Sequence, residues 1–331
     1  MEARPRPVAN WAGMKLALIG YGNVARALMR LIRRKPEYPF TITGIHTLRH
    51  GTAIAAGGLP QEPVFGPRAA SIAEFLDRAD ANAAVELTTL NPSTGEPAIS
   101  HIRAAFARRM HVVTANKGPV AHAYAPLREE AARQGLRFRF ESAVMDGAPV
   151  FNLWHRCLPG LQVLGFTGVL NSTSRVVVET MEHGGSFADG VAKARAMGIT
   201  EADGAFDVEG WDSAAKTAAL ANVLMDACVT PQQVSTRGIT RLTPERVAEI
   251  ARQGKTVRLV SRGRRTPGGA SLRVRAEVLD RSDLLACTPG TSNLILFDTD
   301  LMGTFGTISI NPGVDQTAYG VFSDLVNLLD Q

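Results

Sequence analysis

Residues 15–25 read KLALIGYGNVA, and this stretch predicts the fold of the first half of the chain. Residues 15–19 are an apolar run with the length of a buried strand, and residues 23–34 are amphipathic with helical spacing. A strand, a glycine-rich turn and a helix in this order form the first unit of a dinucleotide-binding α/β sheet. We therefore expect the ordered part of the chain to open with a Rossmann-type unit.

The turn between this strand and helix fits the pattern G-x-G-x-x-G/A at Gly20, Gly22 and Ala25. The first glycine allows a tight turn, the second lets the backbone approach a pyrophosphate, and the small third residue lets helix and strand pack closely. Free N–H groups at the helix N-terminus favour an anion there. Gly20, Gly22, Asn23 and Val24 are therefore predicted to contact a dinucleotide. The alternative is a glycine-rich turn in a sheet protein that binds no nucleotide.

The rest of the chain divides into two patterns. Up to about residue 144, strands alternate with helices, which predicts a doubly wound parallel sheet with helices on both faces. Strands are expected at 40–46, 84–88, 111–114 and 137–144, and helices at 71–79, 96–109 and 124–134. Beyond this point the mixed order predicts an α+β domain. Its helices are expected at 175–181, 187–197, 212–226, 245–252 and 316–329, and its strands at 163–170, 256–261, 271–279, 293–297 and 304–310.

The composition is that of an ordinary globular protein, with 45% hydrophobic and 20% charged residues among 331. Cys157, Cys228 and Cys287 lie far apart without CxxC spacing, which argues against a disulfide framework or a zinc site and favours a reducing cytoplasm. No apolar run reaches the roughly 18 residues of a membrane span. Residues 1–13 lack the apolar core of a secretory signal and are expected to form a disordered leader.

The net charge is +5 and the isoelectric point about 9.4. The arginines are scattered and aromatic residues make up only 6%, so the sequence has no basic stripe with stacking rings of the kind that binds nucleic acid. We expect no nucleic-acid partner and interpret the charge as that of a basic enzyme that attracts anionic ligands.

The end of the second predicted strand bears on the choice of dinucleotide. NAD-binding sheets usually carry an acid there, about 20 residues after the glycine turn, which holds the ribose hydroxyls. Residues 44–50 read GIHTLRH and contain no acid. Arg49, with His46 or His50, could instead meet a 2′-phosphate, which favours NADP over NAD. The alternative is that Arg49 is a solvated loop residue.

The stretch 111–117, HVVTANK, is a buried strand that ends in Asn116 and Lys117. Ligands bind at the carboxyl ends of parallel strands, so Lys117 is predicted to face the binding crevice. The alternative is a lysine on a surface loop.

Residues 198–216, GITEADGAFDVEGWDSAAK, gather five carboxylates ahead of one lysine. Asp212 lies at or next to the N-cap of a long predicted helix, and Lys216 follows four residues later on the same face. The helix dipole disfavours a cation in the first turn, so we expect the pKa of Lys216 to be lowered, with nearby acids countering that shift and holding the ammonium group. These acids could also bind a substrate ammonium. An ordinary capped helix with an i,i+4 ion pair is the alternative.

Taken together, these residues resemble the homoserine dehydrogenase family. The resemblance runs from about residue 16 to residue 324. It rests on HVVTANK at 111–117 and on the signature E-x-D-x-x-x-D-V-x-G-x-D-x-A-x-K at 201–216, with GITRL at 238–242 and GxxxTAYGVFSD at 313–324 as later landmarks. It departs from the family where Gly204 replaces a proline and where residues 88–92 read TTLNP rather than a Thr-Gly-Gly turn.

The resemblance implies an NAD(P)-dependent oxidoreductase that interconverts L-aspartate 4-semialdehyde and L-homoserine. Lys216 would be the catalytic acid–base, and Lys117 would polarise or orient the reacting centre. The expected substrate-binding residues are Glu201, Asp207, Asp212, Asn171, Ser172 and Thr173. The expected cofactor-binding residues are Gly20, Gly22, Asn23, Val24, Arg49, Thr88, Thr89 and Asn116. The changed 88–92 loop leaves open a paralogue that acts on another small hydroxy or aldehyde amino acid.

The resemblance also implies a monovalent cation, Na⁺ or K⁺, bound largely by backbone carbonyls near Glu141, Val144 and Asp146, although Met145-Asp146 replaces the usual small residues. It implies a homodimer formed through the sheet of the second domain. The expected organisation is a leader at 1–13, a dinucleotide-binding domain at 14–145, a substrate-binding and dimerisation domain at 146–312, and a C-terminal helix at 313–331 that packs back on the first domain. No regulatory module is expected after residue 331.

Overall fold

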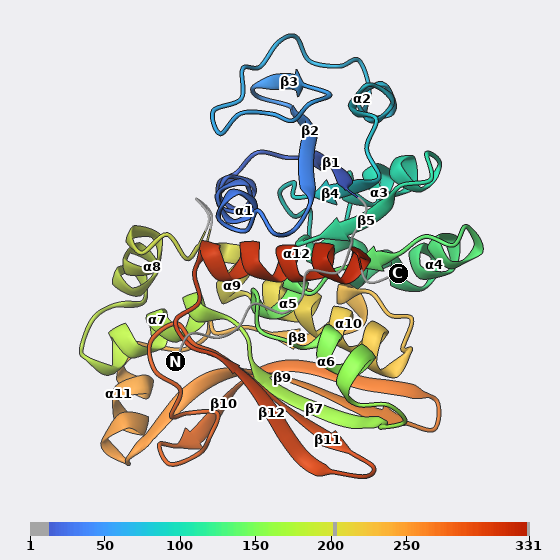
Figure 1. Cartoon of the computed structure of the whole chain (residues 1–331). Coiled ribbons are helices and arrows are strands. Elements are labelled where there is room, and N and C mark those ends of the chain that lie inside the picture. The colour runs from blue at the N-terminus through green and yellow to red at the C-terminus, as the bar shows by residue number, and fades with distance from the viewer. Residues whose placement is uncertain (1–12, 201–203, 330–331) are drawn as a thin grey trace, which may run out of the picture.

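The computed structural model describes residues 13–200 and 204–329, so the leader expected at 1–13 lies outside the described residues except for its last residue. The chain forms two six-stranded sheets with helices on and between them (Figure 1). The first sheet has the strand order β3-β2-β1-β4-β5-β6 and is parallel except for β3, which runs antiparallel to β2. Its strands are β1 (Met14–Ile19), β2 (Phe40–Thr47), β3 (Gly51–Ile54), β4 (Ala83–Glu86), β5 (His111–Thr114) and β6 (Phe138–Arg139).

Helices cover both faces of this sheet. On β1, Leu16 and Leu18 pack toward α1 and α12, whereas Ala17 and Ile19 pack toward α2, α3 and α4. The doubly wound α/β prediction is therefore confirmed. The helices are α1 (Asn23–Arg34), α2 (Ile72–Ala79), α3 (Ala98–Phe106), α4 (Lys117–Arg133) and the C-terminal α12 (Val314–Leu329).

The second sheet has the order β12-β11-β7-β9-β10-β8 and is antiparallel except for β8, which runs parallel to β10. Its strands are β7 (Val163–Val169), β8 (Ser235–Arg237), β9 (Lys255–Thr266), β10 (Gly269–Asp280), β11 (Asn293–Thr299) and β12 (Gly303–Ser309). The remaining helices are α5 (Ser142–Met145), α6 (Phe151–Cys157), α7 (Ser172–Glu182), α8 (Phe187–Ala196), α9 (Ala205–Val208), α10 (Trp211–Met225), α11 (Pro244–Arg252) and the 3₁₀ helix η1 (Pro231–Gln233). The α+β prediction for this half is confirmed.

Helix α10 is the central element between the two halves. It packs against α4 on one side and against β9 and β10 on the other. Five of its alanines are fully or almost fully buried, and their small side chains allow this close approach from both sides. These are Ala214, Ala215, Ala218, Ala219 and Ala221.

Several boundaries differ from the sequence-based predictions. The strand predicted at 137–144 is wrong over most of its length, because only Phe138–Arg139 pairs with β5 and Ser142–Met145 is helical. The helix predicted at 124–134 begins at Lys117, because the Asn116 side chain accepts the Gly118 N–H and caps the helix there. The pattern also missed β3, α6 and β8.

A buried carboxyl group joins the C-terminal helix to the start of the second half. Asp324 on α12 accepts the Glu141 backbone N–H at 2.7 Å and the Asn152 side-chain N–H at 2.8 Å. The Glu141 carboxylate in turn accepts the backbone N–H groups of Val150, Phe151 and Asn152 at the N-terminus of α6. These contacts anchor α12 where it also packs on α1.

We expect Asp324→Asn to change how stability depends on pH. Burial raises the pKa of Asp324 to about 7 from its ordinary value of 3.8, so the folded protein binds this proton more tightly than the unfolded chain. The group therefore stabilises the fold at low pH, and this contribution is lost as the pH rises toward 7. In urea denaturation, the wild-type free energy of unfolding minus that of the variant should fall between about pH 5 and about pH 7.5.

The control is Asp300→Asn, which makes the same chemical change at an exposed carboxyl group. Its difference from wild type should stay nearly constant over this pH range. A constant difference for Asp324→Asn as well would contradict a proton held by the buried Asp324 carboxyl.

Candidate active site

The glycine turn after β1 has the geometry that its motif requires. Gly20 has φ +104°, and a Cβ there would meet the Leu87 carbonyl oxygen at 2.6 Å, so the position excludes other residues. Gly22 is the N-cap of α1 and has open space where a side chain would lie. Ala25 is fully buried against the sheet. The N-terminus of α1 is thus left open for an anionic ligand.

A cleft of about 240 Å³ lies beside this turn, at the carboxyl ends of β4 and β5. It brings together three predicted cofactor residues, Val24, Thr88 and Asn116, with the predicted catalytic Lys117. Its other lining residues were not predicted as site residues from the sequence, and one of them, Thr317, comes from α12. These are Leu87, Leu90, Ala115 and Thr317.

Glu86 fixes residues next to the cleft through hydrogen bonds. It is fully buried and was not predicted as a site residue from the sequence. Its carboxylate accepts the N–H and the hydroxyl of Thr88 and the hydroxyl of Thr114. The Thr88 carbonyl in turn accepts the Asn116 side-chain N–H at 3.2 Å. An acid at the end of the apolar run AAVE was the available signal, because a buried carboxylate needs several donors.

Asp212 joins the two predicted catalytic lysines. Its carboxylate lies 3.1 Å from Lys117 Nζ and 3.0 Å from Lys216 Nζ, and it accepts an N–H from Asn171 at 3.1 Å. Lys216 Nζ also donates to the Leu170 carbonyl at 2.6 Å. All three charged side chains are less than one fifth exposed. Lys117 begins α4 and lines the cleft, so this buried group lies at the end of the cofactor crevice.

The pKa of Lys216 differs from the sequence-based expectation. Burial lowers it, but the carboxylates of Asp212, Asp146 and Asp207 together outweigh burial, so the net shift of the Lys216 pKa is upward. The expected lowering by the helix N-terminus is therefore wrong. The pKa of Asp212 is lowered, because Lys216, Lys117 and the Asn171 hydrogen bond outweigh its own burial. The site holds an ammonium group and a carboxylate at neutral pH.

The turn after β7 supports this group from the other side. Asn171 donates to Asp207 at 2.7 Å, and Asp207 also accepts the hydroxyls of Thr173 and Thr200 at 3.0 and 2.8 Å. Asp207 thus orients Asn171 toward Asp212. The Ser172 hydroxyl instead donates to the Thr291 carbonyl, so Ser172 is not brought to the lysines.

The residues predicted to hold a cation have other contacts. The Glu141 carboxylate caps α6, and the Val144 side chain is buried in the core. Asp146 accepts the Thr317 hydroxyl at 3.2 Å, and burial raises its pKa although Lys216 opposes the shift. Among the described residues, no three His, Cys, Asp or Glu side chains gather at a metal-binding distance. Backbone carbonyls and Asp146 are the oxygen donors that this turn can still offer.

Other predicted site residues lie apart from the cleft. Arg49 is exposed in the turn between β2 and β3, and Thr89 is exposed outside the cleft lining. The suggestion that His46 meets a phosphate is wrong, because its ring is buried and lies 2.8 Å from the Thr52 hydroxyl. Glu201 falls outside the described residues. Within residues 13–200 and 204–329, none of the helices has the length and apolar character needed to cross a bilayer.

A glycine turn at a helix N-terminus, opening into a cleft at the ends of parallel strands, is the arrangement that binds a dinucleotide. A buried lysine at the end of that cleft can give a proton to a carbonyl oxygen or take one from an alcohol. Fold and site therefore define a nicotinamide-dependent oxidoreductase.

Comparison with known protein families shows to which family of oxidoreductases the chain belongs. Residues 20–141 match the model of the homoserine dehydrogenase NAD-binding domain, and residues 149–326 match the model of homoserine dehydrogenase. The chain therefore belongs to the homoserine dehydrogenase family.

Full-length relatives agree with this assignment. The chain is 36% identical to an NAD(+)-dependent homoserine dehydrogenase of Pseudomonas canavaninivorans, over 95% of this chain and 96% of the relative. It is 32% identical to a homoserine dehydrogenase of Methanocaldococcus jannaschii, over 95% and 98%. The crystal structure of a homoserine dehydrogenase from Thiobacillus denitrificans matches with a TM-score of 0.83 at 27% identity, over 96% of this chain and 73% of that one.

Proposed function

We propose that this chain interconverts L-homoserine and L-aspartate 4-semialdehyde with a nicotinamide dinucleotide. The observation that carries the proposal is the buried Lys117–Asp212–Lys216 group at the end of the cofactor cleft. The names of the relatives over nearly the full length of the chain support homoserine as the substrate.

The two lysines have different tasks in this proposal. The bound cofactor supplies the hydride chemistry. Lys216 gives its proton to the aldehyde oxygen during reduction and takes the proton back from the alcohol during oxidation. Its raised pKa keeps it protonated at neutral pH, which is the state that can give a proton to the aldehyde oxygen. Lys117 lies at the cleft and orients or polarises the same oxygen.

The acids around the lysines are proposed to hold the amino-acid part of the substrate. Glu201 and Asp212 would bind its amino and hydroxyl groups, with Asn171 and Thr173 of the turn after β7 and Asp207 of α9 beside them, whereas Ser172 of the same turn bonds to Thr291 instead. The bonds from Asn171 to Asp207 and Asp212 support an orienting role for Asn171 and Asp207 rather than direct contact. Side chains that are already oriented before the substrate binds lower the cost of placing substrate and cofactor together.

NADP is proposed as the preferred cofactor, with Arg49 binding its 2′-phosphate. The end of β2 carries no acid for ribose hydroxyls, and Arg49 is exposed beside it. NAD is the competing choice, because the relative from Pseudomonas canavaninivorans is named as NAD(+)-dependent.

We expect Arg49→Ala to raise the KM for NADP about 10-fold and to leave the KM for NAD unchanged, because a charge-assisted hydrogen bond to phosphate is lost. Initial rates with each cofactor measure this. Arg264→Ala, at an exposed arginine of the second sheet, is the control and should change neither constant. Equal weakening of both cofactors would show that Arg49 does not read the phosphate.

The remaining proposals concern assembly and surroundings. Ile308 on β12 pairs with the buried Leu294 on β11 and is itself 45% exposed, and this exposed apolar side chain supports a homodimer through the second sheet. The solution mass from light scattering is the direct check.

Three free, exposed cysteines support a reducing, cytoplasmic setting. A bound Na⁺ or K⁺ would rely on backbone carbonyls near Glu141 and Val144 and on the Asp146 carboxylate.

The function is tested by absorbance at 340 nm with purified protein, L-homoserine, and NADP or NAD in parallel, in sodium and in potassium buffer. We expect reduction of the cofactor, faster with NADP. A difference in rate between the sodium and the potassium buffer would show that the enzyme uses a monovalent cation. Intact cofactor binding without reduction would instead favour a paralogue with another small hydroxy or aldehyde substrate, and would direct attention to Leu90 of the altered 88–92 loop, which lines the cleft.

We expect Lys216→Ala to lower kcat by at least about 100-fold, as for loss of a general acid, with nearly unchanged cofactor affinity. The same absorbance assay and a fluorescence titration with NADPH measure the two effects. Lys193→Ala, at an exposed lysine of α8, is the matched control. A Lys216→Ala variant with near-normal turnover would remove Lys216 from the proposed chemistry.

A further inference from the structure

Helix α4, whose first residue is Lys117, is broken near its middle. Ala123 has non-helical torsions, φ −144° and ψ 24°, and Pro126 stands one turn beyond. Proline has no N–H and its ring clashes with the carbonyl four residues earlier, so a helix bends at this point. The break ends the segment of α4 that carries Lys117.

Asn222 on α10 bonds to two carbonyls of this segment. Its side-chain nitrogen lies 3.2 Å from the Val120 carbonyl oxygen and 3.3 Å from that of Ala121, and these two carbonyls share one N–H because the other goes to Val229. Both carbonyls belong to the turn just before the break at Ala123. Asn222 is only 4% exposed. A buried carbonyl without a donor is costly, so this side chain stabilises the broken helix where it crosses α10.

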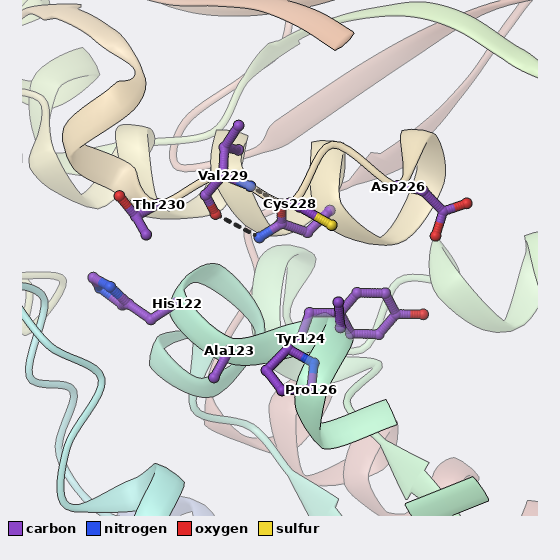
Figure 2. Close-up of a pocket in the computed structure, with 10 residues that line it drawn as sticks. His122, Ala123, Tyr124, Pro126, Asp226, Cys228, Val229 and Thr230 are labelled. Carbon is purple, nitrogen blue, oxygen red and sulfur yellow. Dashed lines mark hydrogen bonds between the residues drawn. The ribbon is translucent and has the colours of Figure 1, made fainter. Parts of the chain in front are cut away.

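The same side chain is fixed by the segment after α10. Asn222 donates to the Val229 carbonyl at 2.8 Å and accepts the Val229 N–H at 2.8 Å, as a neighbouring backbone strand would. Figure 2 shows these two bonds at Val229 as dashed lines, with His122, Ala123 and Tyr124 of α4 on the facing side. The amide group is therefore held in one orientation between three backbone segments.

The two helices that Asn222 joins carry the charged group of the site. Lys117 begins α4, and Asp212 lies in the first turn of α10. A second ion pair, between Arg128 of α4 and Asp226 at the end of α10 at 2.7 Å, is exposed and lies beyond the break. The alanine-rich surface of α10 adds apolar contact without directional bonds. Asn222 thus makes a buried directional contact on the Lys117 side of the break, in addition to the pair of Lys117 with Asp212.

We propose that Asn222 is a positioning residue: by bonding the carbonyls at the break in α4, it sets the crossing of α4 on α10 and so holds Lys117 on Asp212. This inference rests on the proposed roles of Lys117 and Lys216. A misplacement of about 1 Å can lower a rate by about 100-fold, so a contact outside the cleft can govern turnover.

The surroundings of Asn222 allow its side chain to be removed in an experiment. A cavity of about 100 Å³, lined by Asn222, His122, Tyr124 and Val229 among others, adjoins the amide (Figure 2). In Asn222→Ala, water can enter from this cavity and bond to the exposed carbonyls, so the variant is expected to fold. Asn222→Asp keeps the acceptor for the Val229 N–H and removes both donors, and it serves as a second variant.

The experiment is a double-mutant cycle of Asn222→Ala with Lys117→Ala. We expect Asn222→Ala to lower kcat about 10-fold or more with unchanged NADPH affinity. In the Lys117→Ala background, the same change should lower kcat less than about 2-fold, because its effect passes through Lys117. Arg128→Ala removes the exposed pair between the same helices and should leave kcat unchanged.

Pro126→Ala separates the bonds of Asn222 from the effect of the proline itself. It gives an N–H only to the His122 carbonyl, four residues earlier, and none to the Val120 and Ala121 carbonyls that Asn222 bonds to, so adding it to Asn222→Ala, or to Asn222→Asp, should not restore the lost kcat. Additive losses in the cycle, or recovery of kcat by Pro126→Ala, would overturn the inference and leave the proposed function intact. Normal kcat in Lys117→Ala alone would overturn both the inference and the proposed role of Lys117.

Discussion

Two ammonium groups share one buried carboxylate in this protein, and the rest of the structure is arranged around that contact. Asp212 lies within 3.1 Å of both Lys117 and Lys216. Two buried cations this close would repel each other, and the carboxylate between them offsets that repulsion. Lys117 comes from the first half of the chain and Lys216 from the second, so the contact also joins the two halves.

The helix α10 makes this contact possible. Its alanines let α4 and the second sheet approach from opposite sides, so a helix of the second half lies directly under the cofactor cleft of the first. The hydrophobic effect that drives this packing is non-directional. Hydrogen bonds and ion pairs add direction: Asn171 and Lys216 bind Asp212, Asn116 caps α4 at Lys117, and Asn222 is proposed to hold α4 at its break.

Charge and burial compete throughout the site, and the surrounding groups decide the outcome. Burial alone would lower the pKa of Lys216, yet three carboxylates reverse the shift. At Asp324 burial is the largest effect and raises the pKa, with a smaller upward contribution from the Glu141 carboxylate, although two hydrogen bonds and Arg139 oppose it. Neighbouring carboxylates therefore keep the active-site lysine charged against burial, whereas burial prevails at Asp324 and gives its carboxyl group a pKa of about 7.

The sequence by itself determined the features that depend on neighbouring residues. The glycine turn at 20–25, the alternation of strands and helices, and the i,i+4 spacing of Asp212 and Lys216 were predictable because backbone sterics and local hydrogen bonds act over a few residues. Family resemblance, carried by the spacing of the acids at 201–216, added the reaction. Element ends were less certain, as at 137–144, where a two-residue edge strand gives way to a helix.

Only the tertiary structure decided which distant groups meet. Lys117 meets Asp212, and Asn222 bonds to α4, across about 100 positions of the sequence. Thr317 reaches the cleft from the C-terminal helix α12. No local pattern encodes them, because they follow from how whole elements pack. The upward pKa shift of Lys216 has the same origin, since the field at a buried group is the sum over every charge around it.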